Sequence, residues 1–154
     1  MDVETIEVFV KGASRCFAEL TKTPGEIGTP FLKGEFQPSG DYTGAIGITG
    51  CQKGVIALTV SRDMLVQLLD DIGGFTVAEQ LLSDLVGEMA NIISGNARES
   101  LGSNFMISVP VVVDGNGSSI HLDEDLTNFI IPITWKDHTA CLSIHLREGS
   151  EDDE

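Results

Sequence analysis

Glu88 and Asn91 are the two residues of this chain whose types and spacing could do chemistry together. Residues 83–99 carry apolar side chains every three or four positions, which predicts an amphipathic helix. On such a helix Glu88 and Asn91 are neighbours at i and i+3, so both side chains reach the same point in space. A carboxylate and an amide presented together, with Gly95 one turn later, suit a surface that another molecule's backbone approaches closely.

A solvated helix face is the alternative interpretation, because Glu-x-x-Asn also occurs on helices by chance. Asn91 is unfavourable inside a helix. Gly87 and Gly95 each cost a helix about 1 kcal/mol relative to alanine. Asp84 and Gly95 also fall on the same side of the helix as the pair, since each residue turns the helix by about 100°. These features favour a surface shaped for the approach of another molecule.

Three helices are expected to carry and support this surface. Helical spacing of apolar residues predicts an N-terminal helix over residues 2–20. Ser61 is a suitable cap for a second helix. Thr76-Val77-Ala78-Glu79 has the signature of a capping box, which predicts the start of the third and longest helix. This helix runs to about Leu101 and carries the Glu/Asn pair.

The strands are expected to form consecutive hairpins. Residues 41–50 and 55–60 form one hairpin around a glycine-bounded turn, and residues 128–135 and 138–146 form another. Because these strands follow one another rather than alternating with helices, the fold class is α+β with a largely antiparallel sheet.

Two further segments are expected at the margins of the sheet. Residues 27–38 lie between Gly and Pro punctuation and are typical of an extended, irregular edge strand. Pro110 interrupts a β-rich run over residues 105–113. Because proline cannot donate to a strand ladder, Pro110 marks an edge, a bulge or the side of a site.

Length and charge restrict the classes of function. We expect a single domain over residues 1–147 and a disordered acidic tail over residues 148–154. The net charge of −15 argues against nucleic acid and against anionic membranes as partners. No apolar run approaches the roughly 18 residues that span a bilayer, and the N-terminus lacks the basic start of a signal peptide. We therefore expect a cytoplasmic protein.

Other kinds of site find little support in the sequence. The histidines, which lack the spacing of a metal site, are His121, His138 and His145. No Gly-x-Ser-x-Gly elbow or phosphate-binding glycine motif is present. Cys16, Cys51 and Cys141 include no Cys-x-x-Cys pair and are expected to be reduced thiols, with Cys16 and Cys141 as small core residues.

The run Asp84-x-x-x-Glu88-x-x-Asn91, followed downstream by Pro110, resembles the active-site pattern of the CheC/CheX/FliY chemotaxis phosphatase family. Residues 44–58 resemble the glycine-marked hairpin that precedes the helix pair in this family. The resemblance extends from about residue 5 to residue 147. CheC-like members carry the helix motif twice, whereas here Glu7 is followed three residues later by Val10. The chain therefore resembles single-motif CheX proteins more than CheC.

The resemblance implies a CheX/CheC-like fold, in which an antiparallel sheet packs with a long helix pair and an N-terminal helix. It also implies a phosphatase that acts on the phosphoaspartate of a CheY-like response regulator. Asn91 would orient the attacking water and Glu88 would pair with a lysine of the partner, while Asp84, Gly95 and Pro110 would contact the partner. The phosphorylated aspartate and its Mg²⁺ would belong to the partner, so this chain would bind no cofactor.

The resemblance further implies a homodimer formed through sheet edges. Two alternative functions stay open. One is a non-catalytic module of the same fold, similar to flagellar switch proteins, that binds partners without hydrolysis. The other is a small-molecule binding domain, with a groove at Glu88 and Asn91 as its pocket.

Overall fold

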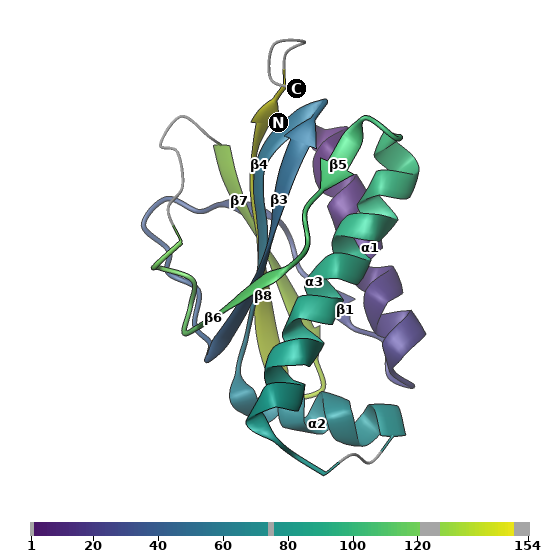
Figure 1. Cartoon of the computed structure of the whole chain (residues 1–154), viewed down its shortest axis with the longest axis vertical. Helices are drawn as coiled ribbons and strands as arrows, with labels where there is room; N and C mark the ends of the chain where they lie inside the picture. The colour runs from purple at the N-terminus through teal and green to yellow at the C-terminus, as the bar shows by residue number, and fades with distance from the viewer. Residues whose placement is uncertain (1, 74–75, 121–126, 150–154) are drawn as a thin grey trace.

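One antiparallel sheet with helices on a single face makes up the structure, a computed structural model that describes residues 2–73, 76–120 and 127–149 (Figure 1). The helices are α1 (Val3–Leu20), α2 (Arg62–Gly73) and α3 (Glu79–Leu101). The strands are β1 (Glu26–Ile27), β2 (Phe31–Leu32), β3 (Tyr42–Gly50), β4 (Gln52–Val60), β5 (Phe105–Ile107), β6 (Val111–Asp114), β7 (Thr127–Trp135) and β8 (His138–Glu148). The predicted α+β class is confirmed.

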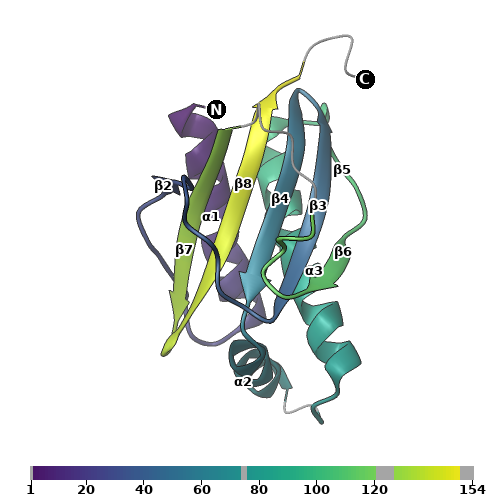
Figure 2. The same cartoon turned by 90° about the vertical axis from the view of Figure 1, so that its left-hand side faces the viewer.

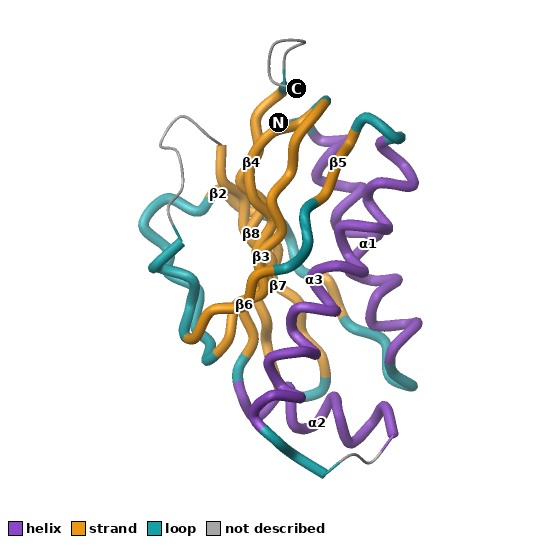
Figure 3. Tube along the Cα trace, in the orientation of Figure 1, coloured by secondary structure: helices purple, strands orange, loops and turns teal. Residues whose placement is uncertain are grey.

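The sheet has the strand order β1-β7-β8-β4-β3-β5, with β2 also pairing with β7 and β6 with β3. All of these pairs are antiparallel. Helices α1 and α3 lie side by side on one face, as Figure 2 shows from the opposite side of the sheet, and α2 crosses one end of the molecule. The other face carries long loops rather than helices (Figure 3).

Both predicted hairpins are present. In the first, β3 and β4 pair from Tyr42 opposite Val60 to Ile48 opposite Gly54. In the second, β7 and β8 pair from Thr127 opposite Leu146 to Trp135 opposite His138. The segment predicted as one irregular edge strand forms only the two short strands β1 and β2. Glu148 belongs to β8, and residues 150–154 of the predicted acidic tail lie outside the described residues.

Side chains at the N-termini of α1 and α2 explain where these helices begin. The Asp2 carboxylate accepts a hydrogen bond from the Thr5 amide at 2.9 Å, and this bond lowers the pKa of Asp2. Ser61 Oγ accepts one from the Met64 amide at 3.1 Å. The predicted cap at Ser61 is confirmed.

The predicted capping box before α3 is wrong. The helix begins at Glu79 after Ala78, which provides no side-chain cap. Instead of reaching back to Thr76, the Glu79 carboxylate accepts hydrogen bonds from Arg62 Nε at 2.9 Å and from the Tyr42 hydroxyl. These bonds lower the pKa of Glu79, with Arg62 the larger cause, and they tie the start of α3 to α2 and β3.

The core fills the space between the sheet and helices α1 and α3. Phe9 of α1 contacts Phe105 of β5 with ring centroids 6.0 Å apart, and Phe17 contacts Trp135 of β7 at 6.5 Å. The Trp135 indole donates its buried N–H to the Thr23 carbonyl at 2.9 Å. Cys16 and Cys141 are buried, as predicted.

Gly44 brings α3 and β3 into direct backbone contact. A Cβ at Gly44 would lie 2.7 Å from the Val86 carbonyl oxygen of α3, closer than such atoms pack. The role predicted for the glycines of this region is to bound the hairpin turn. Gly50 (φ 94°), the last residue of β3, and Gly54 (φ 150°), near the start of β4, fit this role. Gly44 has a different role, because it sets how close the helix lies to the sheet.

Gly44→Ala is expected to destabilise the fold by about 1–3 kcal/mol, since neither backbone can move away from the added methyl without disturbing its own element. Gly95→Ala is the matched control. A Cβ at Gly95 meets nothing within 4 Å, so this variant should gain about 0.5–1 kcal/mol from improved helix propensity. Urea unfolding followed by circular dichroism measures both changes, and equal midpoints for Gly44→Ala and wild type would refute the packing role.

Candidate functional site

Glu88 and Asn91 lie on the face of α3 that points away from the sheet. The opposite face is buried in the core and includes Val86, Met89 and Ala90. Glu88 is exposed and Asn91 is half-buried. Among the described residues, neither side chain has a hydrogen bond or ion pair with the rest of the chain. Their polar groups are therefore available to another molecule.

Around the axis of α3, Asn91 lies between Glu88 and the flank of the helix that meets β5 and β6. Because each residue turns the helix by about 100°, Asn91 lies about 60° around the helix axis from Glu88. Asn91 also follows Gly87 by one turn. A Cβ at Gly87 would lie 3.1 Å from Val112 Cγ2 and 3.7 Å from Pro110 Cβ. The structure therefore brings Pro110, which separates β5 from β6, to within about one helical turn of Asn91.

Glu88 borders an apolar groove on the other side of α3, where α1, α2 and α3 converge. The groove has a volume of about 340 Å³ and is open to solvent. Its lining residues are Leu20, Leu69, Ile72, Leu81, Asp84, Leu85 and Glu88. This groove has no signature in the sequence, because its leucines come from three helices and each belongs to an ordinary amphipathic pattern.

Asp84 and Gly95 lie one turn before Glu88 and one turn after Asn91. Asp84 is exposed and its Oδ1 accepts a hydrogen bond from Gln80 Nε2 at 2.8 Å. Gly95 has open space where a side chain would be. Within the part of the chain that the structure describes, no packing contact requires a glycine at this position.

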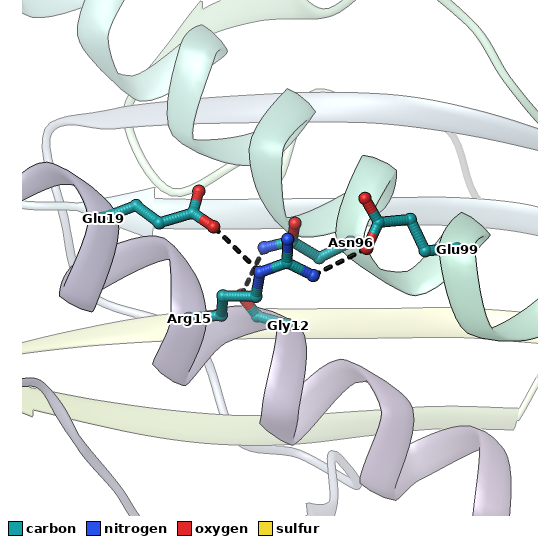
Figure 4. A network of polar contacts seen from close by, with 5 residues as sticks. All are labelled: Gly12, Arg15, Glu19, Asn96 and Glu99. Atoms are coloured by element: carbon teal, nitrogen blue, oxygen red, sulfur yellow. Dashed lines mark hydrogen bonds and ion pairs between the residues drawn. The ribbon is translucent and has the colours of Figure 1, made fainter.

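A polar network fixes α3 against α1 beside this surface (Figure 4). Arg15 of α1 donates to Glu19 at 2.8 Å and to Glu99 of α3 at 2.6 Å. Asn96 Nδ2 donates to the Gly12 carbonyl at 3.1 Å. Because two carboxylates share the Arg15 guanidinium, the network holds the helices together without adding net positive charge.

Cys16 lies close to the pair but is not suited to nucleophilic chemistry. Its buried thiol donates a weak hydrogen bond to the Met89 carbonyl, at 3.9 Å. Burial raises the pKa of Cys16 to about 12, and the nearby carboxylates of Glu19 and Glu88 add to the shift. The thiol is therefore protonated at neutral pH, and the thiolate is the nucleophilic form.

No cluster of three or more possible metal ligands exists in residues 2–73, 76–120 and 127–149, and His121 lies outside these ranges. No helix there is long and apolar enough to cross a membrane. A cavity of about 240 Å³ lies on the loop-covered face of the sheet, lined in part by Lys33, Asn128 and His145. Glu88 and Asn91 do not border it, so the pair belongs to an open surface rather than to this pocket.

Residues 42–134, more than half of the chain, match the model of the protein family described as "Chemotaxis phosphatase CheX". A search of curated proteins found no match.

Solved structures share the whole fold. The CheX crystal structure from Vibrio vulnificus superposes with a TM-score of 0.83 at 23% identity, over 94% of this chain and 100% of that one. A CheC-like protein from Shewanella oneidensis gives 0.82 at 27% identity, over 96% and 100%. CheX of Borrelia burgdorferi, solved as a CheX–CheY–BeF3–Mg²⁺ complex, gives 0.79 at 20%, over 96% and 100%.

Proposed function

The chain belongs to the CheX family of chemotaxis phosphatases, and on that premise we propose that it hydrolyses the phosphoaspartate of a CheY-like response regulator. The observation that carries the proposal is the pair Glu88 and Asn91. The two side chains stand at i and i+3 of α3, Glu88 exposed and Asn91 half-buried, and form no hydrogen bond or ion pair with the described residues.

Asn91 is proposed to position the attacking water. Its amide oxygen accepts a hydrogen bond from the water and its NH₂ group donates one, so the water oxygen lies in line with the bond to be broken. The water attacks phosphorus and the bond between phosphorus and the aspartate oxygen breaks. Inorganic phosphate is released, the protons of the water pass to the phosphate and solvent, and the aspartate carboxylate is restored on the regulator. Phosphoryl transfer of this kind depends mainly on positioning and charge stabilisation, so a side chain without nucleophilic power is sufficient.

Glu88 is proposed to hold the partner. Its carboxylate pairs with a lysine beside the partner's phosphoryl group, in a charge-assisted hydrogen bond. The phosphorylated aspartate and Mg²⁺ come with the partner. The CheX–CheY complex from Borrelia burgdorferi, which contains BeF3 and Mg²⁺, supports this division of roles.

Asp84, Gly95 and Pro110 are proposed to border the contact. Asp84 adds a carboxylate one turn before Glu88 on the exposed face of α3. Gly95 leaves room for the partner's backbone, because nothing lies within 4 Å of its missing Cβ position. Pro110 supports α3 at Gly87, one turn before Asn91.

Asn91→Ala is expected to lower kcat for phospho-regulator hydrolysis by about 100-fold, because the water loses its orientation. Glu88→Ala is expected to raise KM through loss of the lysine contact. Release of inorganic phosphate from a panel of phosphorylated CheY-type regulators measures both. Glu7→Ala and Asn104→Ala are matched controls on exposed residues elsewhere, and Glu7 also tests the single-motif interpretation.

Equal rates for wild type, Glu88→Ala and Asn91→Ala would exclude the proposed roles. Stable binding of a phosphorylated regulator without any change in phosphate lifetime would favour the alternative, a non-catalytic module similar to flagellar switch proteins.

Gly95→Ala separates stability from partner approach. The variant should be slightly more stable than wild type, since the position is a helix interior with open space around it. If the partner's backbone passes over Gly95, the added methyl raises KM for the phospho-regulator at least several-fold. Thermal unfolding and phosphate release on the same preparation measure the two effects. An unchanged KM would remove Gly95 from the proposed contact.

A homodimer through the free edge of β5 and β6 is also proposed. This edge exposes apolar side chains, among them Val109 (80% exposed) and Val111 (60%). Light scattering after size-exclusion chromatography should give twice the monomer mass for wild type and the monomer mass for Val111→Lys, because lysine blocks edge pairing. Leu32→Lys, at the opposite edge, should leave the dimer intact. A monomeric wild type would refute the proposal.

A further inference from the structure

The groove beside Glu88 is lined mostly by aliphatic side chains, although it is open to solvent. Five of its lining residues are aliphatic, four leucines and one isoleucine, and they meet at the junction of α1, α2 and α3. Leu81, in the first turn of α3, is 37% exposed at its rim. An open apolar groove on the surface of a chain with a net charge of −15 is typical of a site that binds a partner.

The polar part of the groove indicates which chemistry its occupant must have. Its two charged lining residues, Asp84 and Glu88, are both acidic. None of the lining residues is basic. Two cations near α2, Arg62 and Lys136, are already paired with Glu79 and Asp71. An occupant must therefore bring an apolar side chain for the hollow and a positive charge for its rim.

Glu88 connects the groove to the proposed active surface, because the same residue lines the hollow and stands at i, i+3 from Asn91. A molecule whose cation pairs with Glu88 places its neighbouring side chains over the groove. A second copy of this chain is a poor occupant, since it would bring further carboxylates to an acidic rim.

We propose that the groove receives an apolar side chain of the response regulator, next to the lysine that pairs with Glu88. This inference rests on the proposed phosphatase function and adds a second anchor to it. The anchor supplies affinity and partner choice, because a buried aliphatic or aromatic side chain contributes much more to binding than an exposed ion pair. Asn91 lies on the side of α3 away from the groove, so it can orient the attacking water while the groove binds the regulator.

The test places a carboxylate in the groove without disturbing the helix. Leu81→Asp lies in the first turn of α3, where an acidic residue is favourable for the helix dipole. Val3→Asp is the matched control, an exposed apolar residue (71%) in the first turn of α1. Both variants are checked by thermal unfolding, and Leu81→Ala serves as a milder second variant.

Two readouts use the full chain and CheY-type regulators. Phosphate release gives kcat and KM, and titration calorimetry gives the Kd for regulator charged with beryllofluoride and Mg²⁺. Leu81→Asp is expected to raise KM and Kd at least about tenfold with kcat within twofold of wild type, as loss of one buried apolar contact predicts. Leu81→Ala should give a smaller increase, and Val3→Asp should match wild type.

The outcomes separate the two proposals. An Asn91→Ala variant that hydrolyses phospho-regulator like wild type, together with weakened binding by Leu81→Asp, refutes the role of Asn91 and supports the groove. A Kd for Leu81→Asp equal to that of Val3→Asp overturns the groove proposal, whatever the catalytic result. If the wild-type chain binds none of the regulators loaded with beryllofluoride and Mg²⁺, both the groove proposal and the proposed phosphatase function are overturned.

Discussion

The close contact between α3 and β3 at Gly44 is the constraint on which the rest of the structure depends. With no side chain between them, the helix backbone lies directly on the strand, and the Val86 carbonyl occupies the space that a Cβ would need. The rotation of α3 is then fixed by its buried stripe, which includes Leu82, Met89 and Ile93. The residues left on the outer side include the acidic and amide groups that carry the proposed chemistry.

Three further contacts hold this arrangement in place. Arg15 and Asn96 join α1 to α3 through polar bonds at 2.6–3.1 Å. Glu79 ties the first turn of α3 to Arg62 and Tyr42. Pro110 packs against α3 at Gly87. Each contact lies beside the outer face rather than on it, so the face is held in position on three sides and Glu88 and Asn91 take no part in these contacts.

Local periodicity is enough to predict the three helices, the two long hairpins and the position of Glu88 and Asn91 outside the buried stripe of α3. Spacing along one element determines which of its sides faces the core, and that information is local. The start of α3 was predicted wrongly for the opposite reason. Glu79 binds Arg62 and Tyr42, which are 17 and 37 residues away, instead of the nearby Thr76. The apolar groove was missed because no single helix contains it.

Glu88 and Asn91 form no hydrogen bond or ion pair within the described part of the chain, which has a consequence for how this protein would behave in a cell. Substitution of a residue without such bonds usually changes stability little, so the amount of folded protein is maintained. Under the proposed function, a chain altered only at Asn91 keeps its fold, its acidic rim and its groove. It would still capture the phosphorylated regulator, but it would hold the phosphoryl group in place instead of releasing it. Such a chain would act as a dominant inhibitor that prolongs the signal, whereas an unfolded one would simply be absent.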